Sequence, residues 1–138
     1  MTSFALGVAA TVIFAFFDYV GFNTMGKLSK IAYRIIQIVF QIGLGVGCCF
    51  LSGWKAPAVF LLLWLTFNAD LIYYAFFDTL KWYGSGAFKR EILGDECTWA
   101  GWTPLGWFRT QGSVVEGWEI LLQAAIGIAL ALEISIYF

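Results

Sequence analysis

Residues 33–52 read YRIIQIVFQIGLGVGCCFLS, residues 53–55 read GWK, and residues 56–80 read APAVFLLLWLTFNADLIYYAFFDTL. A bilayer core about 30 Å thick needs about 20 mostly apolar residues in a helix, and both long runs reach that length. Pro57 stands where the first turn of a helix tolerates a missing N–H. This stretch therefore predicts two membrane-spanning helices joined as a tight antiparallel hairpin.

Two further apolar runs of spanning length lie outside this stretch, at residues 4–24 and 114–137. The 138 residues are 61% hydrophobic and only 12% charged, whereas a soluble domain is roughly half apolar and about a quarter charged. The sequence thus predicts an all-α integral membrane protein whose partner is the lipid bilayer. We expect one transmembrane domain, residues 1–138, with four helices arranged as two antiparallel hairpins.

The loop at residues 81–113 is long and rich in glycine. Within it, residues 97–108 read CTWAGWTPLGWF, which is too short to span a membrane but rich in aromatic side chains. Tryptophan is enriched where a membrane meets water. We expect this Trp-rich segment to lie along the headgroup boundary between the third and fourth helices.

The cations indicate an orientation, because cytoplasmic loops carry an excess of Lys and Arg. Only Lys55 lies on the side that holds both termini. The other side holds seven cations: Lys27, Lys30, Arg34, Lys81, Lys89, Arg90 and Arg109. We therefore expect an inner or plasma membrane protein with both termini on the non-cytoplasmic side and loop 81–113 in the cytoplasm.

Several classes of function find no support in the sequence. Histidine is absent, which removes imidazole-based metal sites and the commonest general base. No basic run suggests nucleic-acid binding. The chain carries no phosphate-binding loop, no HExxH and no Gly-x-Ser-x-Gly motif. These absences favour a non-enzymatic function and leave any metal or cofactor unidentified.

Asp70 is the polar residue least expected in its surroundings. A carboxylate at the centre of a membrane helix costs about 2.5 to 3.5 kcal/mol on insertion scales, so such groups usually face a partner or a cavity. Tyr74 follows four residues later and shares a helical face with Asp70. Asp78 lies nearer the cytoplasmic end of the same predicted helix. Asp70 is thus the predicted binding or coupling group.

The second helix carries a polar stripe. Arg34, Gln37 and Gln41 fall on one face at 100° per residue, and Gly45, Cys48 and Ser52 continue it. Such a face avoids lipid. We expect Arg34 to be the counter-charge of a buried carboxylate on a neighbouring helix, because a paired ion is far cheaper to bury than a lone one.

The fourth helix has a similar face with Glu116, Glu119 and Gln123. Two interpretations stay open for its glutamates. They lie close enough to repel each other beside a cavity, or they lie at the water interface and cap the helix N-terminus, where negative charge is favoured.

The tetrapeptide Ala-Phe-Phe-Asp occurs twice, at residues 15–18 and 75–78. Each copy lies near the predicted cytoplasmic end of an odd-numbered helix. The match is consistent with a duplicated hairpin or with chance in an aromatic-rich chain. In either case it places Asp18 and Asp78 at similar depth.

The candidate binding or coupling residues share a predicted place in the cytoplasmic half of the bundle. They are Asp70, Asp18, Gln41, Glu119, Glu116, Arg34, Tyr74 and Asp78. Either these groups satisfy one another as interhelical hydrogen bonds in a packed bundle, or they line a carboxylate-rich cavity open to the cytoplasm.

Small residues predict helix packing, within the chain or between chains. Gly43 and Gly47 form a GxxxG pair, and Gly127 and Ala131 follow the polar face of the last helix. We expect a homo-oligomer or a hetero-complex through these faces.

Three functions remain. The first is a transporter or channel-type protein that binds or moves a cation, a proton or a cationic solute. The second is an accessory or structural subunit of a larger membrane complex. The third and weakest is a lipid-modifying enzyme at the interface, in which Glu116 and Glu119 would hold a hard ion such as Mg²⁺.

Overall fold

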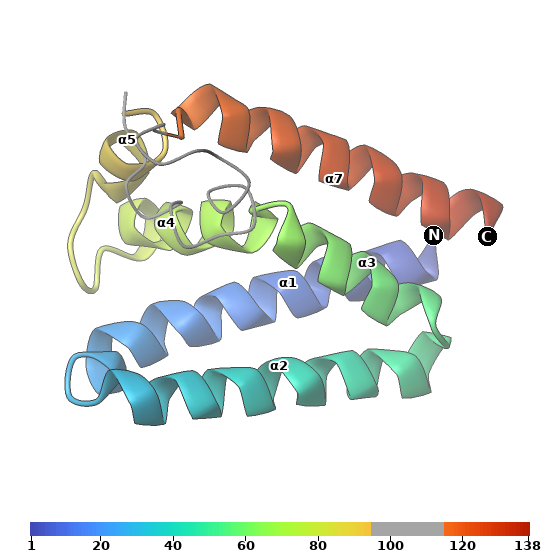
Figure 1. Ribbon diagram of the computed structural model, residues 1–138, viewed down its shortest axis with the longest axis horizontal. Helices are drawn as coiled ribbons and strands as arrows, with labels where there is room; N and C mark the ends of the chain where they lie inside the picture. The colour runs from blue at the N-terminus through green and yellow to red at the C-terminus, as the bar shows by residue number, and fades with distance from the viewer. Residues whose placement is uncertain (95–114) are drawn as a thin grey trace.

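The computed structural model describes residues 1–94 and 115–138, and these residues form helices without any strand (Figure 1). In chain order the helical segments are α1 (Thr2–Gly21), the π-helical turn η1 (Phe22–Gly26), α2 (Lys30–Ser52), α3 (Lys55–Leu65), α4 (Asn68–Leu80), α5 (Ala87–Glu91) and α7 (Gly117–Tyr137). The predicted Trp-rich segment and Arg109 lie outside the described residues.

Three helices in the described ranges are long and apolar enough to cross a membrane: Thr2–Gly26, Lys30–Ser52 and Gly117–Tyr137. The pair α3 and α4 passes the same test together, but its two parts are bent by 68°. The all-helical fold with long apolar helices is thus as predicted. The number of spans is four if the bent pair α3–α4 crosses the membrane as a single span.

Most helix ends differ from the predicted ranges by a few residues. The second helix starts at Lys30 because Ser29 is its N-cap and accepts a hydrogen bond from the Ala32 N–H at 3.4 Å. The last helix starts at Gly117, behind its N-cap Glu116. At the first helix the structure continues through η1 to Gly26.

The single helix predicted over residues 56–80 is broken between α3 and α4. Phe67 has a left-handed backbone with φ 65°, which stops the α-helical hydrogen-bond ladder. The Thr66 hydroxyl donates to the Leu62 carbonyl at 2.7 Å. Asn68 donates to the carbonyl of Ala124 on α7 at 3.2 Å. Contact with α7 thus stabilises a bend at a place with neither proline nor glycine.

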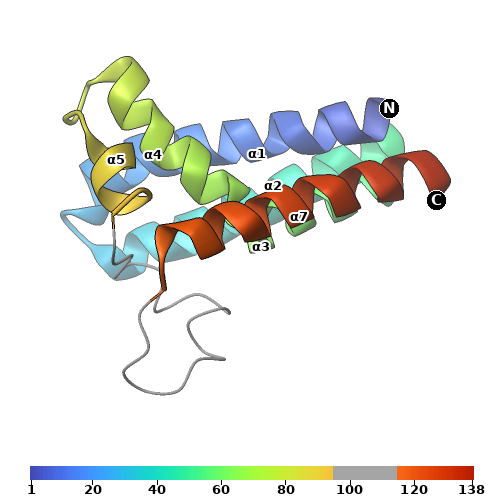
Figure 2. The same ribbon diagram turned by 90° about the horizontal axis from the view of Figure 1, so that it is seen from above.

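Helix α1 lies at the centre of the packing. It contacts α2, α3 and α4, while α7 packs chiefly against α3 (Figures 1 and 2). Phe14 of α1 meets Phe60 of α3 edge to face with ring centroids 6.1 Å apart. Gly127 is where α7 approaches the bend, because a Cβ there would overlap the Thr66 side chain. Both termini lie at the same end of the bundle (Figure 1).

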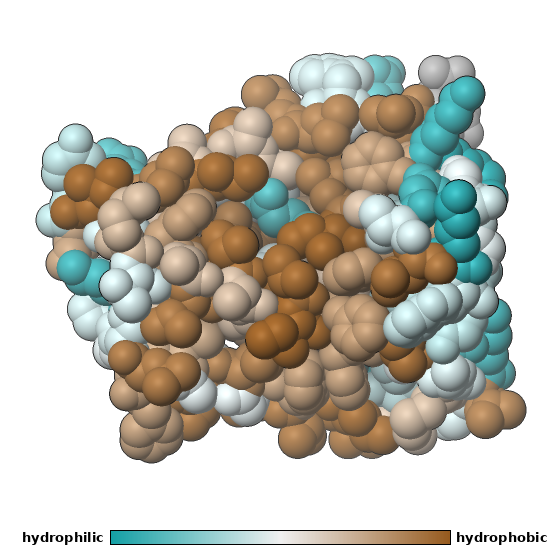
Figure 3. All heavy atoms as spheres, turned by 180° about the vertical axis from the view of Figure 1, so that it is seen from behind, coloured by the Kyte–Doolittle hydropathy of each residue, from teal (hydrophilic) through white to brown (hydrophobic). Residues whose placement is uncertain are grey.

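The outer surface is largely apolar. Figure 3 shows hydrophobic side chains over the middle of one face and hydrophilic side chains gathered at the end where α1 turns into α2. Many side chains of α2 are exposed, among them Ile35, Val39, Ile42 and Val46. Such a surface suits insertion into lipid.

Candidate functional site

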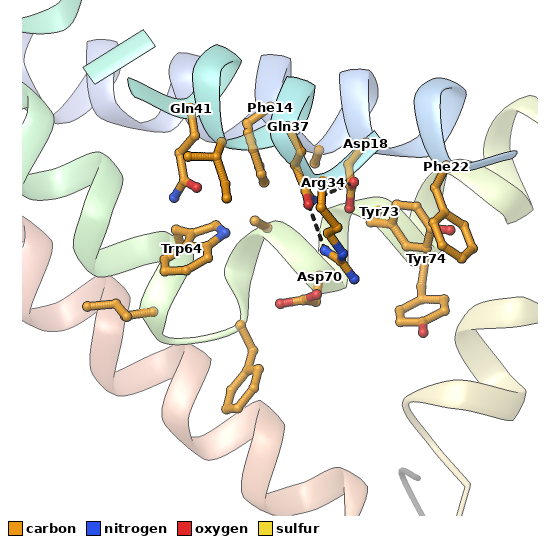
Figure 4. A pocket seen from close by; sticks show the side chains of 15 residues that line it. Phe14, Asp18, Phe22, Arg34, Gln37, Gln41, Trp64, Asp70, Tyr73 and Tyr74 are labelled. Carbon is orange, nitrogen blue, oxygen red and sulfur yellow. Dashed lines mark hydrogen bonds between the residues drawn. The ribbon is translucent and has the colours of Figure 1, made fainter. Parts of the chain in front are cut away.

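A cavity of about 610 Å³ lies between α1, α2 and the bent pair α3–α4 (Figure 4). Its polar lining includes the side chains of Asp18, Arg34, Gln37, Gln41, Asp70 and Tyr74. Aromatic side chains, including Phe14, Phe22, Trp64 and Tyr73, supply much of the rest. The cavity therefore combines charged groups with a mostly apolar wall.

Asp18 is tied to α2 by hydrogen bonds. Gln37 Nε2 donates to Asp18 Oδ1 at 2.7 Å, and the Tyr33 hydroxyl donates to the same oxygen. Tyr33 and Gln37 are four residues apart on α2, so both reach the same point on α1. Both side chains are buried. The Asp18 carboxylate thus joins the last turn of α1 to the first half of α2.

Arg34 extends this network toward the centre of the cavity. Its Nη1 donates to Gln37 Oε1 at 2.6 Å, so the amide of Gln37 connects the guanidinium to Asp18. Gln37 is thus an intermediate between Arg34 and Asp18 that the predicted pairing of Arg34 with a carboxylate did not include.

Asp70 occupies the first turn of α4, directly after the bend. It is half-buried, and in Figure 4 its carboxylate lies between Trp64 on one side and Arg34 on the other. In the described part of the chain, no other side chain donates a hydrogen bond to this carboxylate. Asp70 is thus the carboxylate of the cavity that remains free of the Asp18 network.

Five of the predicted site residues line this one cavity. They are Asp18, Arg34, Gln41, Asp70 and Tyr74. They come from three helices and span 57 positions of sequence from the first to the last, so only the tertiary fold brings them together.

No protein-family model, curated protein or solved structure matches this chain. Its function is therefore inferred from the cavity.

Glu116, Glu119 and Asp78 lie elsewhere. Glu116 is the N-cap of α7, and its N–H donates to Glu119 Oε2 at 2.9 Å as part of a capping box. The Trp118 indole N–H donates to the Glu116 carboxylate. These contacts correspond to the capping interpretation of the two glutamates. Asp78 accepts a hydrogen bond from the backbone N–H of Gly86.

Sequence reasoning passed over three residues of the site. Gln37 belonged to the predicted polar stripe but was not selected as a site residue. Tyr33 lies one turn before Gln37 on the same face, so extending the stripe backward would have found it. Trp64 had no such signal, because its place on the cavity wall depends on the bend.

The cavity lining carries charged and hydrogen-bonding groups in an otherwise apolar wall. Among the described residues that line it, there are two carboxylates, Asp18 and Asp70, and one guanidinium, Arg34. Among residues 1–94 and 115–138, no cluster of three or more His, Cys, Asp or Glu side chains is placed to hold a metal ion. The remaining polar groups are two amides and two phenol hydroxyls, which are suited to hydrogen bonding.

Proposed function

We propose that the chain is an integral membrane protein that binds or moves a cation, a proton or a cationic solute through this cavity. The observation that carries the proposal is the position of Asp18, Asp70 and Arg34 in one cavity inside a bundle of apolar helices. Ionisable residues within membrane helices are costly and commonly mark ion or solute pathways. Asp70 is the proposed binding or coupling group.

The proposed protein has four membrane spans, with α3 and α4 together forming one broken span. The helices then form a single transmembrane domain over residues 1–138, with α1–α2 and α3/α4–α7 as two antiparallel hairpins. The contacts of α1 with α2, and of α3 with α7, support this arrangement. The arrangement is also supported by the two termini, which lie at the same end of the bundle (Figure 1).

The proposed orientation puts both termini on the non-cytoplasmic side of an inner or plasma membrane. Lys27 and Lys30 flank the turn from η1 into α2, and Lys89 and Arg90 lie in α5. Figure 1 shows these segments at the end opposite the termini. The excess of cations there supports a cytoplasmic position.

The break between α3 and α4 also supports a transport function. In secondary transporters, substrate sites are commonly formed where a membrane helix is discontinuous, and irregular backbone is tolerated there because it lines a cavity. Trp64, Leu65, Phe67 and Asp70 come from both sides of the break and line the cavity. The proposed site therefore lies at the discontinuity.

An oligomer accompanies this proposal, since four short helices seldom enclose a pathway alone. Gly43 and Gly47 on α2 are exposed, and a Cβ at either would meet nothing within 4 Å. Gly127 and Ala131 instead pack inside the chain, Gly127 against Thr66 at the bend and Ala131 against Val59 and Leu63 of α3. The α2 glycines are thus the better of the predicted contact residues for a second chain.

Flux measurements in proteoliposomes test the proposal. We expect purified wild-type protein to carry protons, metal ions or small organic cations across the vesicle membrane. Asp70→Asn should abolish this flux, because it removes the charge that binds the cation but keeps the shape of the side chain. The matched control is Asp78→Asn on the same helix, which lies outside the cavity and should keep the flux. Absence of any Asp70-dependent flux would refute the proposal.

The exposed α2 glycines also favour a second candidate, an accessory subunit of a larger membrane complex. Purification in mild detergent from the native membrane distinguishes the transporter from the accessory subunit. A stable hetero-complex that is lost with Gly43→Leu supports the subunit. A homo-oligomer that retains cation binding supports the transporter.

A further inference from the structure

We propose that the cavity selects an organic ammonium ion, with the cationic group on Asp70 and the adjoining carbon groups on the indole of Trp64. This inference rests on the proposed function and narrows its ligand from any cation to one chemical class.

The bend between α3 and α4 brings Trp64 and Asp70 to the wall of one cavity. Trp64 lies in the last turn of α3, and Asp70 lies in the first turn of α4, six residues later. In one continuous helix these side chains would point about 120° apart around the axis. Across the 68° bend both line the same cavity, and Figure 4 shows the Trp64 indole and the Asp70 carboxylate on its wall.

The size of the cavity suits an organic molecule. A volume of about 610 Å³ lies within the range of about 300 to 1,000 Å³ that is typical of small-molecule sites. A metal ion bound directly by protein needs several oxygen, nitrogen or sulfur ligands around a much smaller space. The described residues offer no such cluster.

The wall of the cavity points to the same class. Trp64 is half-buried and packs against the core cluster that contains Phe14 and Phe60. In the described ranges it makes no ring-to-ring contact, in contrast to Tyr73, which packs on Tyr19 and Phe77. A tryptophan face is the best aromatic partner for an ammonium ion. Trp64 therefore packs against the core cluster and also lines the cavity, where a ligand can contact it.

The charges assign the cationic group to Asp70. Asp18 is held by Tyr33 and Gln37, and Arg34 is held by Gln37. One carboxylate and one guanidinium therefore belong to the network between α1 and α2. Asp70 takes no part in these hydrogen bonds, and it is the second carboxylate among the described residues that line the cavity. A carboxylate in a mostly apolar wall suits a ligand with a positive charge.

Calorimetric titration of the protein in dodecyl maltoside micelles tests the inference. The probe is benzyltrimethylammonium, and the comparison ligands are potassium, magnesium and N-benzylacetamide, a neutral molecule of similar size. We expect the ammonium ion to bind at least tenfold more tightly than each comparison ligand. Equal binding of the neutral molecule, or no binding of the ammonium ion to folded wild-type protein, would overturn the inference.

Variants identify the residues. Trp64→Leu should weaken ammonium binding by roughly two- to thirtyfold, the range of a cation–π contact from exposed to desolvated sites, and Trp64→Phe should weaken it less. Asp70→Asn should remove binding, and Asp70→Glu should restore part of it. Trp54→Leu and Asp78→Asn are matched controls outside the cavity and should bind like wild type. Thermal melts of every variant verify folding.

The outcomes separate this inference from the proposed function. If Asp70→Asn abolishes proteoliposome flux while Trp64→Leu keeps wild-type ammonium affinity, the transport proposal stands and the ammonium class is wrong. If ammonium binding depends on both residues but no cation crosses the vesicle membrane, the ligand class stands and transport is wrong.

Discussion

The two copies of Ala-Phe-Phe-Asp, at residues 15–18 on α1 and 75–78 on α4, have the same side chains but different surroundings. Asp18 lines the cavity and accepts hydrogen bonds from Tyr33 and Gln37. Asp78 accepts one hydrogen bond from the exposed backbone N–H of Gly86. The aromatic parts of the two copies touch, since the rings of Phe16 and Phe76 lie 5.5 Å apart.

The difference teaches that the neighbouring element decides what a repeated carboxylate does. Helix α2 follows α1 after a short turn and presents a polar face to Asp18. After α4, the chain instead enters a glycine-containing turn that places Gly86 beside Asp78. The same tetrapeptide thus places Asp18 in a hydrogen-bond network between helices and Asp78 in a local contact with a turn.

Removing each carboxylate is the strongest way to break this comparison. Asp18→Ala leaves the buried donors of Tyr33 and Gln37 without their acceptor, at about 1 to 3 kcal/mol for each buried group that finds no new partner. Asp78→Ala exposes one backbone N–H that water can satisfy, so we expect a loss within about 1 kcal/mol. Reversible unfolding in mixed micelles measures both free energies. Equal losses would show that the two sites are alike.

Asp18→Asn separates the hydrogen bonds from the charge. The amide oxygen can still accept from Tyr33 and Gln37, so the free energy of unfolding should stay closer to wild type than in Asp18→Ala. A large loss in the Asn variant would instead assign the stabilisation to the charge of Asp18 beside Arg34.

Gly86→Ala tests whether the Asp78 site depends on its backbone turn. Gly86 has φ 73°, a left-handed conformation that costs an L-residue about 1 to 2 kcal/mol. We expect a loss of about 1 kcal/mol in the free energy of unfolding and no change at the cavity. Gly45→Ala is the control, because Gly45 is helical with open space around a Cβ. A loss as large in Gly45→Ala would refute the turn explanation.

The smallest expected effect is at the contact between the two copies. A double-mutant cycle of Phe16→Leu and Phe76→Leu should give a coupling energy of about 0.5 to 1.5 kcal/mol, as for other aromatic pairs. Unfolding midpoints of the two single variants and the double variant supply it. Additive effects would mean that the two copies pack independently.

The helical fold was predictable because hydrophobic length is a strong signal, and three of the four predicted runs are continuous helices of spanning length. The break after Leu65 was not predictable. Kinks usually arise at proline or at glycine and serine, and Thr66-Phe67-Asn68 has none of these. Its cause is the contact of Thr66 and Asn68 with α7, which lies more than fifty residues away in sequence.

The candidate site was predictable in its charges but not in its geometry. Asp18, Asp70 and Arg34 stood out because ionisable groups in apolar helices need partners, and all three line the cavity. Glu116 and Glu119 gave the same signal, yet they cap α7. The sequence shows that such a group is costly in a membrane, but it does not show how its helix is rotated. Trp64 was not selected because its place on the cavity wall depends on the bend.

The bend at Thr66 has a consequence for the order of biosynthesis. Polar backbone groups released at a break cost several kcal/mol each in hydrocarbon, and α7 is the element that packs on this bend. A chain entering the membrane from its N-terminus carries α3 and α4 there before α7 has been made. We therefore expect α3 and α4 to insert as one straight helix and to bend when α7 docks. The cavity would then be the last part of the molecule to form.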